Sequence, residues 1–200
     1  MVIRKNLKKN VLISVFDKKK LRYLCHNLSK FNYNFISSGS TGDKIRSMGF
    51  KCKDVSKITK FKEMFDGRVK TLNPIIYSSL LYIRDNIDHK KQFIKLNIPQ
   101  IDIVIVNLYP FQKYLEQNKK KKIVEMIDIG GPSLLRAAGK NYKYVTGISS
   151  IDDYAKLIEN LSKNNGYTDE NFRKKMACKI FIKTSKYDKV ISGWLSEDKK

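Results

Sequence analysis

Two nearly continuous apolar runs constrain the fold of this chain most. The first run is Val11 to Phe16, and the second is Ile101 to Tyr109, the clearest strand of the sequence. A half-exposed strand alternates apolar and polar residues, whereas an unbroken β-branched run indicates a strand buried on both faces. Strands of that kind belong to parallel sheets covered by helices. The two runs therefore predict an α/β domain.

Helical patterns separate these strands from further short strands. Leu21, Leu24, Cys25 and Leu28 would share one face of a helix, with Asp17 as its predicted N-cap. Further strands are expected at 33–36, 52–55 and 144–149, and helices at 45–48, 74–84, 90–96, 152–161 and, as one or two helices, 168–196. The order predicts a three-layer α/β domain with a central, mostly parallel sheet flanked by helices, and C-terminal helices packing back on it.

The length and charge bound the class of protein. The 200 residues suit one domain, residues 1–200, in which 168–198 form a C-terminal helical part. The net charge of +22 is compatible with nucleic-acid binding. The lysines are scattered, however, and Ile, Asn, Tyr and Phe are also abundant, which favours compositional drift with some steering of an anionic substrate. We expect no specific nucleic-acid partner.

The cysteines and histidines argue against a metal site. Cys25, Cys52 and Cys178 lie far apart and form no CxxC pair, which indicates a reducing compartment and a cytoplasmic location. Only His26 and His89 are present, without ligand spacing, so no metal is expected. The first apolar run is too short for a signal peptide or a membrane span.

Hydroxyl- and glycine-rich turns follow the first two strands. Backbone N–H groups of such turns, together with the positive ends of helices, bind phosphate well. Plain turns have the same composition in about half of such cases, so both interpretations stay open. The candidate phosphate ligands are Ser14, Lys18, Ser38, Gly39, Ser40 and Thr41.

The stretch Asp66 to Thr71 carries the strongest concentration of binding groups. Arg68 and Lys70 lie two residues apart and would point the same way in an extended segment, with the Thr71 hydroxyl beside them. Gly67 permits a positive φ. A guanidinium, an ammonium and a hydroxyl suit an anionic or oxygen-rich small molecule, although a solvated basic turn has the same composition.

Two more segments carry candidate chemistry. Asn107 and Tyr109 end the clearest strand, where open α/β sheets bind ligands, although a lone tyrosine is more often a packing residue. Asp128 precedes the turn formed by Gly130, Gly131 and Pro132, and Lys140 ends the helix that follows. Structurally, Asp128 could cap that helix and Lys140 could offset its dipole. The segment 118–122 is expected to be a solvated loop or helix start.

Taken together, these segments resemble one enzyme family. The segments are 66–71, 107–111, 127–131, 135–141 and 183–188, and they occur in the family's order and at compatible spacings. The resemblance as a whole extends from about Asn10 to Trp194. They are similar to inosine monophosphate cyclohydrolase, the N-terminal half of the bifunctional purine biosynthesis protein that also contains an AICAR transformylase. The resemblance implies a methylglyoxal-synthase-like (MGS-like) fold.

The resemblance also implies an activity and its residues. The family, a group of hydrolases acting on cyclic amidines, closes the ring of formamidoimidazole carboxamide ribotide with loss of water, without cofactor or metal. Matching positions imply Lys70, Tyr109, Asp128 and Lys140 as catalytic, with Asp128 and Lys140 as a charge-coupled pair. Those implied in substrate binding are Ser14, Lys18, Ser38, Gly39, Ser40, Thr41, Arg68, Thr71, Asn107, Gly130 and Gly131. The transformylase half is not expected here, and the resemblance leaves a homodimer open.

Four positions depart from the family pattern. Phe16 replaces a serine of the first phosphate turn, and Ser40 replaces a glycine of the second. Asn73 and Lys183 each stand where the family usually has histidine. The departures concern binding and leave Lys70, Asp128 and Lys140 in place.

Two other functions are weighed against the cyclohydrolase. Methylglyoxal synthase shares the fold but works with carboxylates and an active-site histidine, and both histidines here are expected in helices away from the strand ends. A regulatory or nucleic-acid-binding module would explain the charge but has no need of both Asp128 and Lys140.

Overall fold

A computed structural model describes residues 8–116 and 123–197 and confirms the α/β class. Among these residues the sheet has five strands, and every neighbouring pair is parallel. The strands are β1 (Lys9–Val15), β2 (Tyr33–Ser37), β3 (Cys52–Asp54), β4 (Ile103–Asn107) and β5 (Thr146–Ile148). Their order across the sheet is β3-β2-β1-β4-β5.

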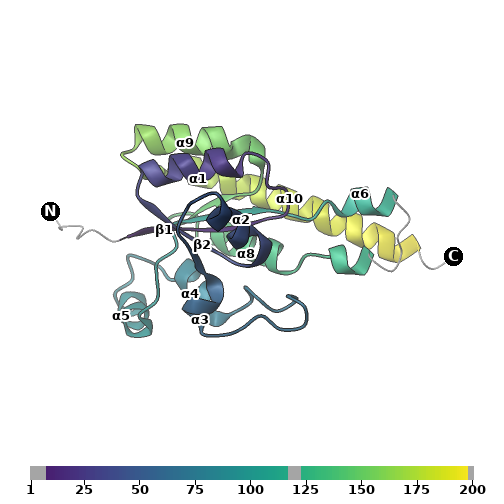
Figure 1. Ribbon diagram of the computed structural model, residues 1–200, viewed down its shortest axis with the longest axis horizontal. Helices are drawn as coiled ribbons and strands as arrows, with labels where there is room; N and C mark the ends of the chain where they lie inside the picture. The colour runs from purple at the N-terminus through teal and green to yellow at the C-terminus, as the bar shows by residue number, and fades with distance from the viewer. Residues whose placement is uncertain (1–7, 117–122, 198–200) are drawn as a thin grey trace.

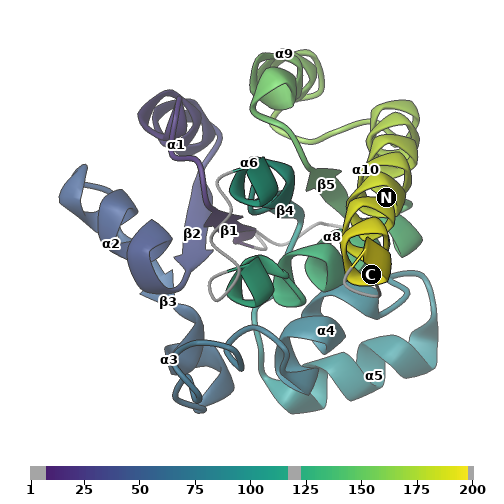
Figure 2. The same ribbon diagram turned by 90° about the vertical axis from the view of Figure 1, so that its right-hand side faces the viewer.

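Helices cover both faces of this sheet (Figures 1 and 2). One face carries α1 (Leu21–Lys30), α2 (Gly39–Ser47) and α9 (Tyr154–Lys163). The other carries α3 (Val55–Thr59), α4 (Pro74–Leu81), α8 (Gly130–Lys140) and α10 (Glu170–Glu197). Outside these layers lie α5 (Ile87–Leu96), α6 (Phe111–Glu116), and the 3-10 turns η1 (Val124–Met126) and η2 (Ile151–Asp153).

The core explains why the strands read as continuous apolar runs. Val11 and Ile13 of β1 pack under α1 and α9, whereas Leu12 between them packs under α4 and α8. All three side chains are fully buried. A strand buried on both faces has no solvent side on which polar residues would be favoured. The two apolar clusters therefore lie on opposite faces of the sheet, and β1 contributes side chains to both.

Several helices begin or end at other residues than the sequence predicted. Asp17 does not cap α1, so that prediction is wrong: the helix begins at Leu21 after Lys20 in a left-handed conformation, and the Asp17 carboxylate accepts the Lys19 N–H instead. The predicted helix 74–84 ends at Leu81, and 168–196 forms one helix, α10. The expected loop at 118–122 lies outside the described residues. No helix among the described residues is long and apolar enough to cross a membrane.

The strand order reverses between β1 and β4. From β1 the chain moves outward through β2 to β3, and it then returns to place β4 on the other side of β1. Connections above the carboxyl ends of β1 and β4 diverge at this switch point, which is where open α/β sheets bind ligands. The predicted phosphate turns and Asn107 lie at this edge.

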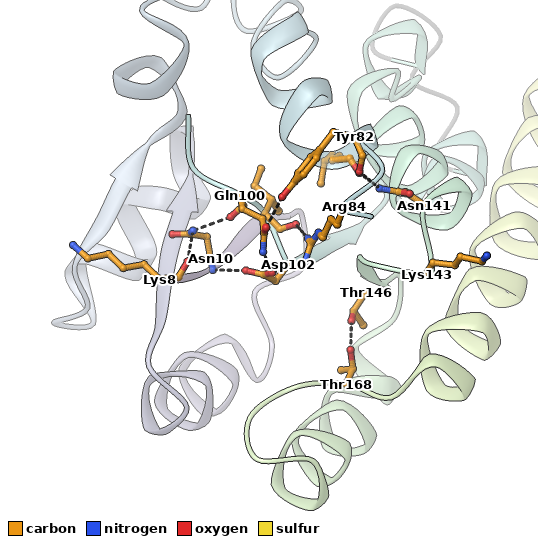
Figure 3. Close-up of polar contacts among 12 residues, drawn as sticks. Lys8, Asn10, Tyr82, Arg84, Gln100, Asp102, Asn141, Lys143, Thr146 and Thr168 are labelled. Carbon is orange, nitrogen blue, oxygen red and sulfur yellow. Dashed lines mark hydrogen bonds and ion pairs between the residues drawn. The ribbon is translucent and has the colours of Figure 1, made fainter. Parts of the chain in front are cut away.

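The opposite, amino-terminal edge is held by a network around Asp102 (Figure 3). Its carboxylate accepts hydrogen bonds from Arg84 Nη1 at 2.9 Å, Gln100 Nε2 at 2.6 Å and the Asn10 N–H at 3.0 Å. Tyr82 in turn donates to Gln100. The Arg84 and Asp102 side chains are 20% and 13% exposed, so this ion pair is largely withdrawn from water. The network joins β1, β4 and the segment after α4.

Replacing Asp102 by alanine is expected to destabilise the fold strongly. The change leaves the buried Arg84 guanidinium without its counter-charge, which typically costs about 3–5 kcal/mol. The measurement is the free energy of unfolding in urea. Asp43→Ala is the matched control, since it breaks an Arg–Asp pair with Arg46 that is exposed, where the loss is below about 1 kcal/mol. Equal losses in both variants would contradict the role of burial.

Candidate active site

The Asn107 side chain closes the turn at the switch point. Its Oδ1 accepts the N–H groups of Phe16 and Asp17 at 2.7 and 2.9 Å, and its Nδ2 donates to the Asp17 carbonyl at 2.8 Å. The amide thus ties the carboxyl end of β4 to the turn after β1. Asn107 shapes this turn through its own hydrogen bonds, a role that the sequence alone did not indicate.

The residues predicted around the first turn divide by environment. The buried Thr41 hydroxyl donates to the Val15 carbonyl at 3.0 Å and accepts the Val15 N–H at 3.2 Å, so it ties the first turn of α2 to the end of β1. Ser14 is half-buried in β1, opposite Val106 of β4. Lys18 Nζ lies 3.3 Å from the Phe16 carbonyl, at the surface of the same turn.

The second turn brings Gly39 and Lys70 together. Gly39 begins α2 with φ +51°, and a Cβ built on it would overlap the Lys70 ammonium. Ser38 precedes the helix in an extended conformation, and its hydroxyl makes no capping bond to α2. Ser40 is exposed in the first helical turn. A glycine at position 39 therefore permits both the backbone conformation and the close approach of Lys70.

The stretch that carries Lys70 is a tight hairpin, so the extended arrangement in which Arg68 and Lys70 would point the same way is not adopted. Met64 and Val69 form an antiparallel bridge, and Phe65, Asp66 and Gly67 all have positive φ between them. Only the expectation of positive φ at Gly67 is confirmed.

The two cations of this hairpin have separate acidic partners. Lys70 Nζ lies 3.0 Å from Glu63 Oε2, and Arg68 forms a bidentate pair with Glu125 of η1. We expected Arg68 and Lys70 to point the same way toward one ligand, but in the structure each of them pairs with a different glutamate. Sequence reasoning missed both glutamates, because Glu63 meets Lys70 only across the hairpin and Glu125 is remote in sequence.

Thr71 connects the hairpin to the Gly130–Gly131 segment. The buried Thr71 hydroxyl lies 3.1 Å from where a Cβ on Gly130 would stand. Gly130 is the first residue of α8, so Lys70 and Thr71 lie between the amino ends of α2 and α8. Both ends carry partial positive charge. Predicted segments separated by about 90 positions thereby form one site.

Asp128 is held at the start of α8 by a second set of contacts. Its Oδ1 accepts the Gly131 N–H at 2.8 Å, and a Cβ at Gly131 would overlap the carboxylate. The N-cap residue of α8 is Ile129, so Asp128 is not the cap itself, although its carboxylate accepts one backbone N–H of the first turn. Burial raises the pKa of this carboxyl, an effect that the Gly131 hydrogen bond partly offsets. A raised pKa makes the carboxylate a better proton acceptor.

Tyr187 of α10 fixes the backbone beside Asp128. Its hydroxyl accepts the Asp128 N–H and donates to the Met126 carbonyl, both at 2.8 Å. Burial is the main reason that its pKa rises to about 12. In the sequence Tyr187 appears as part of the segment 183–188 that carries the family resemblance, with no site role of its own. Its hydroxyl instead ties α10 to the Asp128 segment.

Tyr109 lies beside the first turn. Its ring packs on Phe16 with centroids 5.0 Å apart, and its side chain is 37% exposed. Tyr109 is also close enough to Tyr187 to influence the pKa of that phenol. The structure thus places Tyr109 just beyond the carboxyl end of β4, with Phe16 as its direct neighbour.

Lys140 does not join this group within the chain. It is the exposed last residue of α8, whereas Asp128 stands just before the first residue of the same helix. Twelve helical steps correspond to about 18 Å, well beyond the reach of a lysine side chain. The predicted charge-coupled pair of Asp128 and Lys140 is therefore not formed inside one chain.

A cavity of about 390 Å³ opens beside Lys70. Ser38, Gly39, Glu63 and Lys70 line it, together with residues from the starts of α2 and α3. This volume falls within the range of small-molecule sites. Among the described residues, no cluster of histidine, cysteine and carboxylate side chains has the composition of a metal site.

Comparisons with known proteins agree with this arrangement. Residues 20–133 match the family model of the MGS-like domain, and residues 138–200 match that of the AICARFT/IMPCHase bienzyme. The bifunctional purine biosynthesis protein PurH of Magnetococcus marinus is 43% identical over 190 residues, which are 94% of this chain and 36% of that protein. PurH of Clostridium botulinum is 44% identical over 95% of this chain and 38% of its own length.

A solved structure shows the same architecture. The crystal structure of ForH superposes with a TM-score of 0.80 at 26% identity, covering 92% of this chain and 96% of that one. The chain spans somewhat more than a third of the length of the curated relatives it matches. Since the model of the MGS-like domain matches more than half of the residues, this chain belongs to the MGS-like domain family.

Proposed function

We propose that this chain is an inosine monophosphate cyclohydrolase. One observation carries the proposal: the ammonium of Lys70 and the hydroxyl of Thr71 lie between the amino ends of two helices, and the Asp128 carboxylate lies at the second of these. The likeness to PurH proteins over nearly the whole chain supports the same activity. The substrate would be formamidoimidazole carboxamide ribotide and the product inosine monophosphate, at the last step of purine biosynthesis.

The reaction forms one C–N bond and expels one water. The carboxamide nitrogen attacks the formyl carbon, the formyl oxygen gains negative charge, and that oxygen later leaves as water after protonation. The carboxamide nitrogen gives up one of its two protons, the formamido nitrogen gives up its proton as the C=N bond forms, and both hydrogens leave with the formyl oxygen as water. The site must therefore supply a proton acceptor near the amide and cationic or N–H donors near the formyl oxygen. No redox change occurs, and every atom lost is accounted for by the departing water.

Each of these needs has a candidate side chain at the site. Asp128, half-buried and with a raised pKa, suits the removal of the amide proton. Lys70 suits stabilisation and protonation of the formyl oxygen, with Tyr109 as a second donor from the β4 end. The phosphate would lie on the turns after β1 and β2, where Lys18 and Ser38 are placed at the surface. Backbone N–H groups at the start of α2 add to this binding.

The other functions find less support. His26 is an exposed residue of α1, and His89 of α5 accepts the Ile83 N–H through Nδ1; neither histidine lines the cavity beside Lys70. A methylglyoxal synthase mechanism that uses an active-site histidine has no group to perform it at this site. We also propose a cytoplasmic location, no specific nucleic-acid partner and no membrane partner.

Lys140 raises the question of a second copy. The resemblance implies that Lys140 is catalytic, yet α8 holds it away from Asp128 of its own chain. A contribution from Lys140 calls for another chain that brings it to the site, so we extend the proposal to a homodimer. Sedimentation equilibrium of the purified chain would show a dimer mass. A monomer that retains full activity would contradict this extension.

Gly131→Ala is expected to impair catalysis through Asp128. The added Cβ would overlap the carboxylate, so Asp128 must leave its hydrogen bond with the residue 131 N–H. Displacement of a catalytic group by about 1 Å lowers turnover by about 100-fold. Steady-state kinetics with the formamido ribotide measure the loss. Gly193→Ala is the matched control, because nothing lies within 4 Å of its added Cβ; a similar loss there would contradict the steric explanation.

Lys70→Ala and Asp128→Asn are each expected to lower kcat by about two to four orders of magnitude, the range for a lost acid–base or oxyanion group. The assay follows inosine monophosphate by absorbance and chromatography, without folate or metal. Ser38→Ala provides the contrast, since the loss of a phosphate-binding side chain should raise KM and leave kcat largely unchanged. Wild-type turnover in both Lys70→Ala and Asp128→Asn would refute the proposed function.

A further inference from the structure

We propose that Glu63 is a positioning residue that holds the Lys70 ammonium against the Gly39 turn. This inference rests on the proposed function, because it concerns the residue that would stabilise the formyl oxygen. Its structural basis is the 3.0 Å ion pair between Glu63 Oε2 and Lys70 Nζ. Both side chains line the cavity beside the start of α2.

The hairpin itself sets Glu63 opposite Lys70. Met64 and Val69 pair in antiparallel fashion, so the residues that flank them, 63 and 70, are the next neighbours across the two arms. The left-handed turn at Phe65 and Asp66 closes the arms at this register. A carboxylate at 63 therefore meets an ammonium at 70 as a direct consequence of where the hairpin turns. Neither group needs a contact from a more distant element.

Lys70 needs such a partner because of where its amine lies. The ammonium packs on Gly39, the first residue of α2, and the amino end of a helix carries partial positive charge. A cation at that end is repelled, and a flexible lysine would swing into solvent. Glu63 supplies the opposing charge on the other side of the amine. The carboxylate thus offsets the helix dipole and keeps the ammonium over the turn.

Because the pair is exposed, a role of Glu63 in positioning Lys70 can be distinguished from a role in the stability of the fold. The Glu63 side chain is 55% exposed and that of Lys70 is 27% exposed. Exposed ion pairs contribute only about 0–1 kcal/mol to folding, so the loss of Glu63 leaves the fold nearly unchanged. A small energy suffices, however, to choose between two rotamers of one lysine. The effect of Glu63 should therefore appear in the position of Lys70 and not in unfolding.

The first test reads the position of Lys70 without any substrate. Trace acetylation of the native chain with acetic anhydride, followed by mass spectrometry, measures how readily the Lys70 amine reacts relative to the other lysines. Glu63→Gln should raise the labelling of Lys70 several-fold, and Glu63→Asp should give an intermediate value. The matched control is Glu159→Gln, which breaks an exposed glutamate–lysine pair with Lys163 on α9 and should leave Lys70 unchanged.

The second test reads catalysis. Glu63→Gln should lower kcat by about 10- to 100-fold, the scale for a misplaced catalytic group, with KM changed little. Glu63→Asp should recover part of the loss, and the urea midpoint should stay at the wild-type value. Unchanged labelling of Lys70 in Glu63→Gln would overturn the proposal, as would raised labelling with normal kcat. A fall in KM would also overturn it, because Glu63 would then be a counter-ion that competes with the substrate. A wild-type chain without activity would refute the proposed function alone, and the labelling would still decide whether Glu63 holds Lys70.

Discussion

The parallel pairing of β1 with β4 is the contact on which the rest of the structure depends. The two strands come from distant parts of the chain and share a register from Val11 opposite Ile103 to Val15 opposite Asn107. Both are buried on each face, so their pairing joins the two apolar clusters of the domain. It also aligns their carboxyl ends, where the Asn107 amide ties β4 to the turn after β1. The switch point and the site above it exist because these two strands are neighbours.

The two edges of the sheet have different chemistry. At the amino edge, Asp102 and Arg84 are withdrawn from water, and their partners satisfy most of their hydrogen-bonding groups (Figure 3). A network of that kind fixes one arrangement of the strands. At the carboxyl edge, Arg68 and Lys70 are paired by glutamates that are half exposed. Exposed pairs of this kind leave the two cations accessible from solvent, so a rigid network at one edge and accessible charge at the other suit a binding site on a firm scaffold.

Much of the fold could be predicted because burial leaves its mark on local sequence. The apolar run of β1 and the face formed by Leu21, Leu24, Cys25 and Leu28 both appear in the structure as expected. Asp17 failed as a cap because a left-handed residue at Lys20 starts the helix later. Contacts between remote segments could not be predicted from local patterns. Glu125 meets Arg68 across 57 positions, and the Tyr187 hydroxyl reaches Asp128 across 59. Likewise, the separation of Lys140 from Asp128 became visible only once α8 was known to run unbroken between them.

The positions at which this chain departs from the family pattern have structural roles of their own. Asn73 accepts the Ile75 N–H and caps α4, the helix that follows the hairpin. Phe16 packs on Tyr109, so an aromatic contact stands where the family pattern has a hydroxyl. Lys183 donates to the Ser149 carbonyl at the end of β5, and burial lowers its pKa. Asn73 and Lys183 thus bond to the backbone and Phe16 packs on Tyr109, whereas Ser40 is exposed; the side chains of Lys70, Thr71 and Asp128 keep their contacts with the two glycine turns. The departures therefore change how the site is supported more than the groups that would perform its chemistry.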